Sequence, residues 1–310
     1  MINPQIIDWL LDSDVSLQYQ VYRDLLDLER PDLQMLIAET GWGAKFLSFR
    51  NANNHWGRGF YAPKWTSSHY TLLDLRQLCI YSENELIRET IRMTANEEKG
   101  KDGGINPSGT ITESDVCING MFLNYASYFR VGEELLKSVV DFIITQQLPD
   151  GGFNCRFNRS GAHHSSLHST LCVIEGINEY AQNGYSYRVD ELKKMELASR
   201  EFILIHRLFK SDKTGCIIDR KMLMLSYPLR WRYDILRSLD YFRLSNTSFD
   251  DRMTDAIDVL KIKQRTDEKW PLQARHTGEV HFDMEQHGKA SKWNTLRALR
   301  VLRYFNRFNS

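Results

Sequence analysis

Apolar side chains recur at helical spacing along almost the whole chain, and no convincing run of alternating apolar and polar residues is bounded by turn signals. Residues 114–129 are apolar on nearly every side, whereas 133–143 carry their apolar residues on one stripe. The first pattern is typical of a helix buried all round, and the second of a helix with one face in water. The same pairing recurs at 165–181 followed by 190–209, and at 231–244 followed by 250–263. The pattern predicts an all-α protein built from hairpins of one inner and one outer helix.

An internal repeat supports this alternation. The string S-x-[H/W]-x-T-L occurs three times, beginning at Ser67, Ser166 and Ser291. Alignment on these strings places one residue of each inner helix at a common position, and the six residues are Gln18, His69, Cys117, His168, Trp231 and Trp293. We expect them near the inner-helix starts, at one mouth of a central cavity.

Six inner helices with six outer partners close into a ring if residues 4–11 pack as the outer partner of the last helix, 291–305. Closure would remove both ends of an open helical array. We therefore predict an α/α toroid that forms a single domain over residues 1–310. In this arrangement residues 1–50 close the ring, and residues 65–307 form the helical-hairpin repeats.

The charge balance narrows the range of partners. Lys and Arg number 40 and Asp and Glu also 40, so the net charge favours no polyanion and we expect no nucleic-acid partner. The longest apolar runs fall well short of the roughly 18 residues that cross a bilayer, so we expect no membrane span. The N-terminal segment lacks a basic leader, which favours a cytoplasmic location. Five cysteines are an odd and sparse set, which is typical of reduced thiols.

A second signature lies between the helices, as KDGGI at 101–105 and PDGGF at 149–153, where Asp and Gly suit tight turns. Residues 146–153 match the repeat Q-x-x-D-G-G-[F/W] most closely. From about residue 65 to 305 the chain resembles the family of squalene cyclases and protein prenyltransferase β subunits, which are α/α toroids. Segments 230–243 and 291–305 resemble bacterial squalene-cyclase-like proteins of unassigned function. The resemblance implies a central pocket for an apolar, isoprenoid-type substrate.

The two branches of this family use different chemistry. Squalene and hopene cyclases protonate their substrate with a DxDD motif, which this sequence lacks; Asp250 and Asp251 are the nearest pair and suit a helix N-cap. Protein prenyltransferases hold zinc with an aspartate and a cysteine at the start of one inner helix and a histidine at the start of the next.

Asp115, Cys117 and His168 occupy these zinc-ligand places. The resemblance therefore implies a zinc site with one open position, which could activate a thiol or water. The alternatives are a helix-terminal charge for Asp115, a buried filler for Cys117 and a core histidine for His168.

Further candidate side chains surround the expected cavity. The candidates for substrate binding are His69, Arg156, His163, His164, Trp231, Tyr233, Trp293 and Arg297, and those for general acid or base chemistry are Asp115, Asp234 and Glu285. Glu175 lies two turns after His168, and Arg297 lies one turn after Trp293. If this row faces the cavity, a deep Glu175 must pair with an arginine.

These observations favour an enzyme of the prenyltransferase or squalene-cyclase type that acts on an apolar substrate, with zinc as its candidate cofactor. One alternative is a glycan-processing hydrolase or lyase, for which Asp234 and Glu285 would face each other at roughly 5 to 10 Å. The other is a non-catalytic binding or scaffold protein, whose cavity would be filled and would hold no converging polar groups.

Overall fold

The structure is a computed structural model that describes residues 2–108 and 111–306. Helices make up most of it, which confirms the predicted helical class. The α-helices are α1 (Pro4–Leu11), α2 (Val15–Leu25), α3 (Pro31–Leu36), α4 (Gly41–Ser48), α5 (Ser68–Gln77), α6 (Glu85–Glu97), α7 (Val116–Tyr128), α8 (Glu133–Thr145), α9 (Phe157–Ser160), α10 (Leu167–Gln182), α11 (Val189–Ile205), α12 (Ile235–Leu244), α13 (Thr254–Ile262) and α14 (Lys292–Asn306). Short 3-10 helices span Arg220–Leu223 and Asp251–Met253, and β1 (Trp270–Pro271) pairs antiparallel with β2 (Ala290–Ser291).

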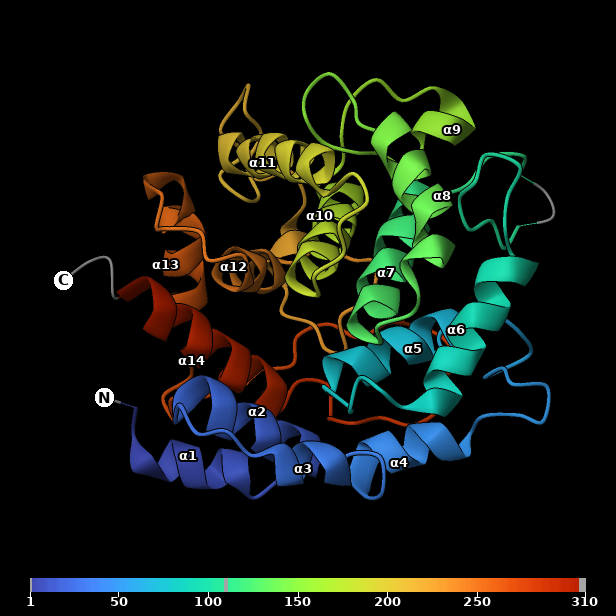
Figure 1. Cartoon of the computed structure of the whole chain (residues 1–310). Helices are drawn as coiled ribbons and strands as arrows, with labels where there is room; N and C mark the ends of the chain where they lie inside the picture. The colour runs from blue at the N-terminus through green and yellow to red at the C-terminus, as the bar shows by residue number, and fades with distance from the viewer. Residues whose placement is uncertain (1, 109–110, 307–310) are drawn as a thin grey trace.

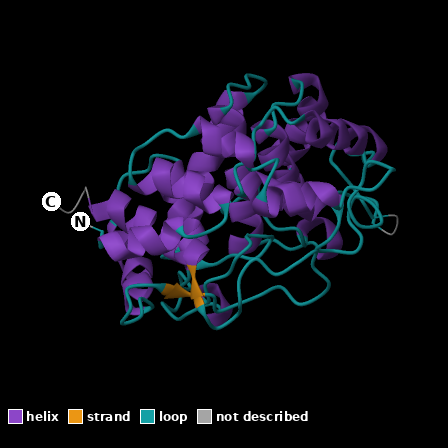
Figure 2. Cartoon of the chain, turned by 90° about the horizontal axis from the view of Figure 1, so that it is seen from below, coloured by secondary structure: helices purple, strands orange, loops and turns teal. Residues whose placement is uncertain are grey.

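The helices follow one another around a common centre, with α6, α8, α11 and α13 on the outside (Figure 1). Neighbouring helices contact each other in the order α2, α4, α5, α7 and α10, and α12 contacts α14. The last helix, α14, packs against α2 near the start of the chain. Long loops and the strand pair gather along one edge of the molecule (Figure 2).

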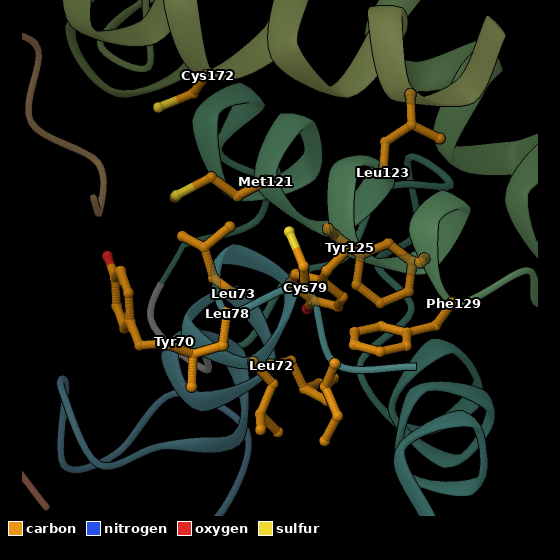
Figure 3. Packing of buried hydrophobic residues seen from close by; sticks show 14 of the residues in the cluster. Tyr70, Leu72, Leu73, Leu78, Cys79, Met121, Leu123, Tyr125, Phe129 and Cys172 are labelled. Atoms are coloured by element: carbon orange, nitrogen blue, oxygen red, sulfur yellow. The ribbon is translucent and has the colours of Figure 1, made fainter. Parts of the chain in front are cut away.

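The inner and outer helices differ in burial as the sequence pattern predicts. Nearly all of α7 is buried, whereas α8 buries a stripe that contains Leu136, Val139 and Val140. Figure 3 shows Leu73 of α5 turned towards Met121 of α7. Both belong to one cluster of buried apolar residues, together with Tyr70, Leu72 and Tyr125. This apolar packing holds the inner helices in place around the centre.

Two glycines bring α7 and α10 into close contact. A Cβ atom on Gly120 would lie 2.6 Å from the carbonyl oxygen of Cys172, and one on Gly176 would lie 2.3 Å from the carbonyl oxygen of Gly120. Such distances are far inside van der Waals contact, so only glycine lets the two backbones approach this closely.

The D-G-G turns hold the starts of the inner helices. The Asp102 carboxylate accepts hydrogen bonds from the Ser114 N–H, at 2.7 Å, and from the Ser114 hydroxyl, at 2.8 Å. Asp150 accepts the same two bonds from Ser165, at 2.8 and 2.5 Å. The repeated motif thus has a structural role, since it fixes the loop that leads into each helix.

Two predictions need correction. The helix expected from Trp231 begins only at Ile235, because the Asp234 side chain accepts the Arg237 N–H at 2.8 Å and caps the helix there. Cys117 and Cys155 form a disulfide, so the expectation of reduced thiols is wrong for this pair. Within residues 2–108 and 111–306, no helix is both long enough and apolar enough to span a bilayer.

Candidate functional site

A pocket of about 340 Å³ lies between α2, α5, α7, α10, α12 and α14, and we call it the central pocket. The lining residues of α2, α5, α7 and α10 lie in the C-terminal halves of these helices, and Gln20, Arg76, Tyr128 and Gln182 are examples. The sequence instead predicted a cavity lined by the N-terminal ends of the inner helices. The central pocket therefore lies farther from the N-terminal ends of these helices than the sequence predicted.

Among the described residues, ten of the 23 that line the central pocket are charged. They are six arginines and four carboxylates, namely Arg23, Arg76, Arg237, Arg243, Arg297, Arg300, Asp24, Glu175, Glu179 and Asp240. Positive charge is thus in excess. The sequence predicted that Glu175, if deep, would pair with an arginine. In the structure its Oε1 accepts a hydrogen bond from Arg237 Nε at 2.9 Å.

Ion pairs connect the helices across the pocket. Arg300 of α14 reaches Asp24 of α2 at 2.7 Å, and it also binds Asp240 of α12. Burial alone would raise the pKa of Asp240, but the neighbouring Arg300 and Arg243 bring it well below its usual value. Both aspartates are therefore held ionised between cations.

Arg297 has two buried nitrogens without a hydrogen-bond partner, more than any other described arginine that lines the central pocket. Its side chain is 2% exposed, and its Nη1 donates to the Ser226 carbonyl and to Asn294 Oδ1, each at 3.3 Å. Its Nε and Nη2 have no hydrogen-bond partner, although Nε lies 3.6 Å from Asp240 Oδ2. Burial lowers the pKa of Arg297, as expected for a desolvated cation. Nε and Nη2 share one edge of the guanidinium, which is the edge that binds carboxylate or phosphate in bidentate fashion.

A second pocket of about 210 Å³, the loop pocket, is lined by Phe46, Asp74, segment 227–230 and segment 272–287. Tyr227 lines both pockets, and its ring stacks on that of Trp293 with centroids 4.5 Å apart. The two pockets therefore adjoin at this aromatic pair.

Three predicted site residues line one of the two pockets. Trp293 and Arg297 line the central pocket, and Glu285 lines the loop pocket. Glu285 also accepts hydrogen bonds from the Ser291 hydroxyl and the Lys292 N–H, at 2.5 and 2.6 Å, and so holds the start of α14. Burial raises the pKa of this carboxyl.

The other predicted substrate-binding residues line neither pocket. His69 is fully buried and bonds the Tyr125 hydroxyl at 3.2 Å, and the Tyr233 hydroxyl donates to the Leu208 carbonyl at 2.5 Å. Trp231 is partly buried beside the His168 ring. The remaining three, Arg156, His163 and His164, are exposed loop residues or helix-flanking residues.

Asp234 has a structural role in this arrangement. Its Oδ1 caps α12, and its Oδ2 accepts a hydrogen bond from the Ser226 hydroxyl at 2.7 Å. The side chain is almost completely buried and lines neither pocket. It is therefore not placed with Glu285 in either described pocket.

The candidate zinc ligands each have another partner. Asp115 Oδ1 accepts from Arg159 Nε at 2.8 Å, Cys117 is in its disulfide, and His168 Nδ1 accepts the Tyr233 N–H at 2.8 Å. Among the described residues, no group of three or more His, Cys, Asp or Glu side chains is arranged to hold a metal ion. This arrangement does not fit a zinc site, and we derive no reaction step through zinc.

Comparison of the chain with protein-family models and with curated proteins finds no match. The site must therefore be interpreted from its own geometry. Sequence reasoning missed Arg23, Arg76, Arg243 and Asp240 of the central pocket. The available signal was the presence of charged residues inside otherwise apolar inner helices, as in ILRSLDYFRL of α12.

Proposed function

We propose that the protein is an α/α toroid whose central pocket binds a small organic anion. The packing of α14 against α2 and the lining of one pocket by six helices support the closed arrangement. The S-x-[H/W]-x-T-L strings and the D-G-G turns support a place among prenyltransferase and squalene-cyclase-like proteins.

The observation that carries the proposed ligand class is the unpartnered edge of Arg297. A buried guanidinium with two free donors is costly, and a carboxylate or phosphate would satisfy both donors at once. The excess of arginine around it favours the same ligand charge. Arg76 Nε and Arg243 Nη2 also lack partners, and both side chains line the pocket.

The ligand can also carry an apolar part. The central pocket includes Leu73, Leu229, Leu244 and Trp293 alongside its arginines. An amphipathic ligand such as an isoprenoid diphosphate fits this mixture, with its diphosphate at Arg297 and its tail on the apolar side chains. This form of the proposal joins the charged lining with the isoprenoid-type substrate that the sequence resemblance implies.

Calorimetric titration tests the proposal with three probes: pyrophosphate, geranyl diphosphate and geraniol. We expect the two diphosphates to bind, and to bind more weakly as salt is added. R297K keeps the positive charge but lacks the bidentate edge, so we expect it to weaken diphosphate binding by about tenfold or more.

The matched control is R303K on the same helix. Arg303 does not line the central pocket; it pairs with the exposed Asp27 and donates to the Asp24 carbonyl at 3.0 Å, so R303K should leave the affinity unchanged. Release of pyrophosphate from geranyl diphosphate would add catalysis to binding. If geraniol binds as well as its diphosphate and R297K has no effect, the pocket is an apolar site and the anion proposal is wrong.

A further inference from the structure

The loop pocket holds a group of buried polar side chains that the proposed function does not use. Asp74 comes from α5, Tyr227 and Arg230 from the loop before α12, and His276 from the segment between β1 and β2. Each of the four is less than 10% exposed. Segments far apart in the sequence therefore bring these side chains together in one cavity.

Every one of these four side chains has a buried polar atom without a hydrogen-bond partner. The atoms are Asp74 Oδ1, the Tyr227 hydroxyl, Arg230 Nε and Nη1, and the ring nitrogens of His276, whose neighbouring acceptor, the Pro228 backbone, lies outside good hydrogen-bond geometry. Buried polar groups in folded proteins are nearly always satisfied, and isolated exceptions are few. Four such side chains around one cavity offer their unpartnered atoms to whatever molecule occupies it.

The charges of the loop pocket disfavour an anionic ligand. Arg230 pairs with Asp74 at 3.3 Å, so the two charges offset each other. Burial lowers the pKa of His276 to about 3 and that of His281 to about 4, which leaves both rings neutral near pH 7. The lining as a whole contains two arginines and three carboxylates. Unlike the central pocket, it has no excess of positive charge to attract an anion.

The unpartnered atoms also define the hydrogen bonds that the ligand must make. Arg230 only donates, the Asp74 carboxylate only accepts, and a neutral imidazole and a phenol each do both. The aromatic side chains Phe46 and Phe282 lie beside them, with ring centroids 4.6 Å apart. A ligand suited to this lining needs several groups that both donate and accept, mounted on a compact frame that can pack on aromatic rings.

We propose that the loop pocket binds an uncharged polyhydroxylated compound of about the size of one monosaccharide. A hydroxyl group donates and accepts, so a ring of hydroxyls can meet Asp74, Arg230 and His276 together. The small volume, about 210 Å³, suits one ring rather than a chain. Asp74, Arg230 and His276 do not line the central pocket, so this ligand and the anion proposed there would be held by different polar groups.

Saturation-transfer NMR and calorimetry on the full chain test this with glucose, N-acetylglucosamine and myo-inositol, and with glucuronate as the charged counterpart. We expect an uncharged probe to bind, and H276F and Y227F each to weaken its binding by tenfold or more. Both variants keep an aromatic ring and remove unpartnered polar atoms, so their melting temperature should stay the same or rise. H69F is the matched control, because His69 is also buried but lies outside the pocket.

Three results would overturn the proposal: binding of none of the uncharged probes, binding of glucuronate alone, or unchanged affinity in both H276F and Y227F. In the first case water molecules would satisfy the unpartnered atoms. R297K separates this test from that of the central pocket, because it should weaken diphosphate binding without changing the affinity for the uncharged probe.

Discussion

Four histidines that are buried or partly buried place titratable groups in the protein interior: His69 and His276 are buried, and His168 and His281 are partly buried. Burial lowers the pKa to about 3 for His69 and His276, and to about 4 for His168 and His281. The same ring in an unfolded chain has a pKa near 6.5. Below about pH 6.5 the unfolded state therefore binds protons that the folded state rejects.

This sets the sign of the pH dependence. Where the unfolded state binds more protons, stability falls as the pH falls, by about 1.4 kcal/mol per pH unit for each group. Asp74 acts in the opposite direction, because burial raises its pKa to about 6 and the folded state takes up its proton first. Burial also raises the pKa values of Glu98 and Glu285, so these two carboxyls act in the same direction as Asp74. We expect the four histidines to outweigh the three carboxyls between pH 6 and 4, so acid should destabilise the protein in this range.

Urea unfolding of wild type and H69F at pH 6, 5 and 4 measures the effect. His69 is completely buried. Its replacement by Phe removes the proton that the unfolded chain binds at this position and the folded protein does not. The dependence of the unfolding free energy on pH should become shallower by about 1.4 kcal/mol per pH unit. Parallel curves for the two proteins would show that His69 is protonated in the folded state.

At the scale of helices, the contact between α7 and α10 depends on the absence of side chains. G176A places a Cβ atom against the Gly120 carbonyl, so the two helices must separate or strain. We expect a loss of about 1 to 3 kcal/mol in unfolding free energy, which is the usual cost of an overpacked core.

G132A is the matched control for this variant. Gly132 precedes α8, and no atom lies within 4 Å of a Cβ built there. Urea unfolding should show it close to wild type. An equal loss in the two variants would mean that glycine flexibility, and not the helix contact, sets the cost.

Helix periodicity predicted the elements well where one face or all faces are apolar. The predicted 114–129 corresponds to α7, Val116–Tyr128, and the predicted 4–11 coincides with α1. The start of α12 was misplaced, because Trp231 looks like an inner-helix residue by its chemistry and its neighbours. The capping bond of Asp234 decides the boundary, and it depends on local geometry that periodicity does not contain.

The sites were predictable only in part. Arg297 and the pairing of Glu175 followed from helical spacing, since residues three and four apart share a face. Asp74 and His276 did not, because segment 272–287 folds back as a long loop over α5 and no periodic pattern governs such a path. Cys117 and Cys155 are likewise brought together by tertiary folding.

At the scale of the whole molecule, Arg300 ties the last helix to the helices on either side of it. It pairs with Asp24 of α2 and Asp240 of α12, and all three side chains are buried. R300M removes one buried cation, so the buried carboxylates of Asp24 and Asp240 each lose one of their ion pairs. We expect a loss of about 3 kcal/mol or more in unfolding free energy, as for other buried pairs that lose one partner.

The control on the same helix is R303M. Arg303 pairs with the exposed Asp27, and such a pair contributes about 0 to 1 kcal/mol. It also donates to the Asp24 carbonyl at 3.0 Å, a hydrogen bond that contributes about 1 kcal/mol, so we expect a smaller loss than for R300M. Both values come from urea unfolding at neutral pH. A small effect of R300M would mean that Arg23 and Arg243, which also pair with these aspartates, are sufficient without it.

Tyr227 lines both pockets, and this has a consequence for how their occupancies depend on each other. A ligand that shifts the Tyr227 ring in one pocket changes the surface offered to the other. Thermodynamic linkage then makes the effect reciprocal, so each ligand alters the affinity of the other by the same factor. The stacked pair of Tyr227 and Trp293 would then couple the two sites. Each ligand would raise the affinity of the other if both favour the same position of the Tyr227 ring, and lower it if they favour different positions.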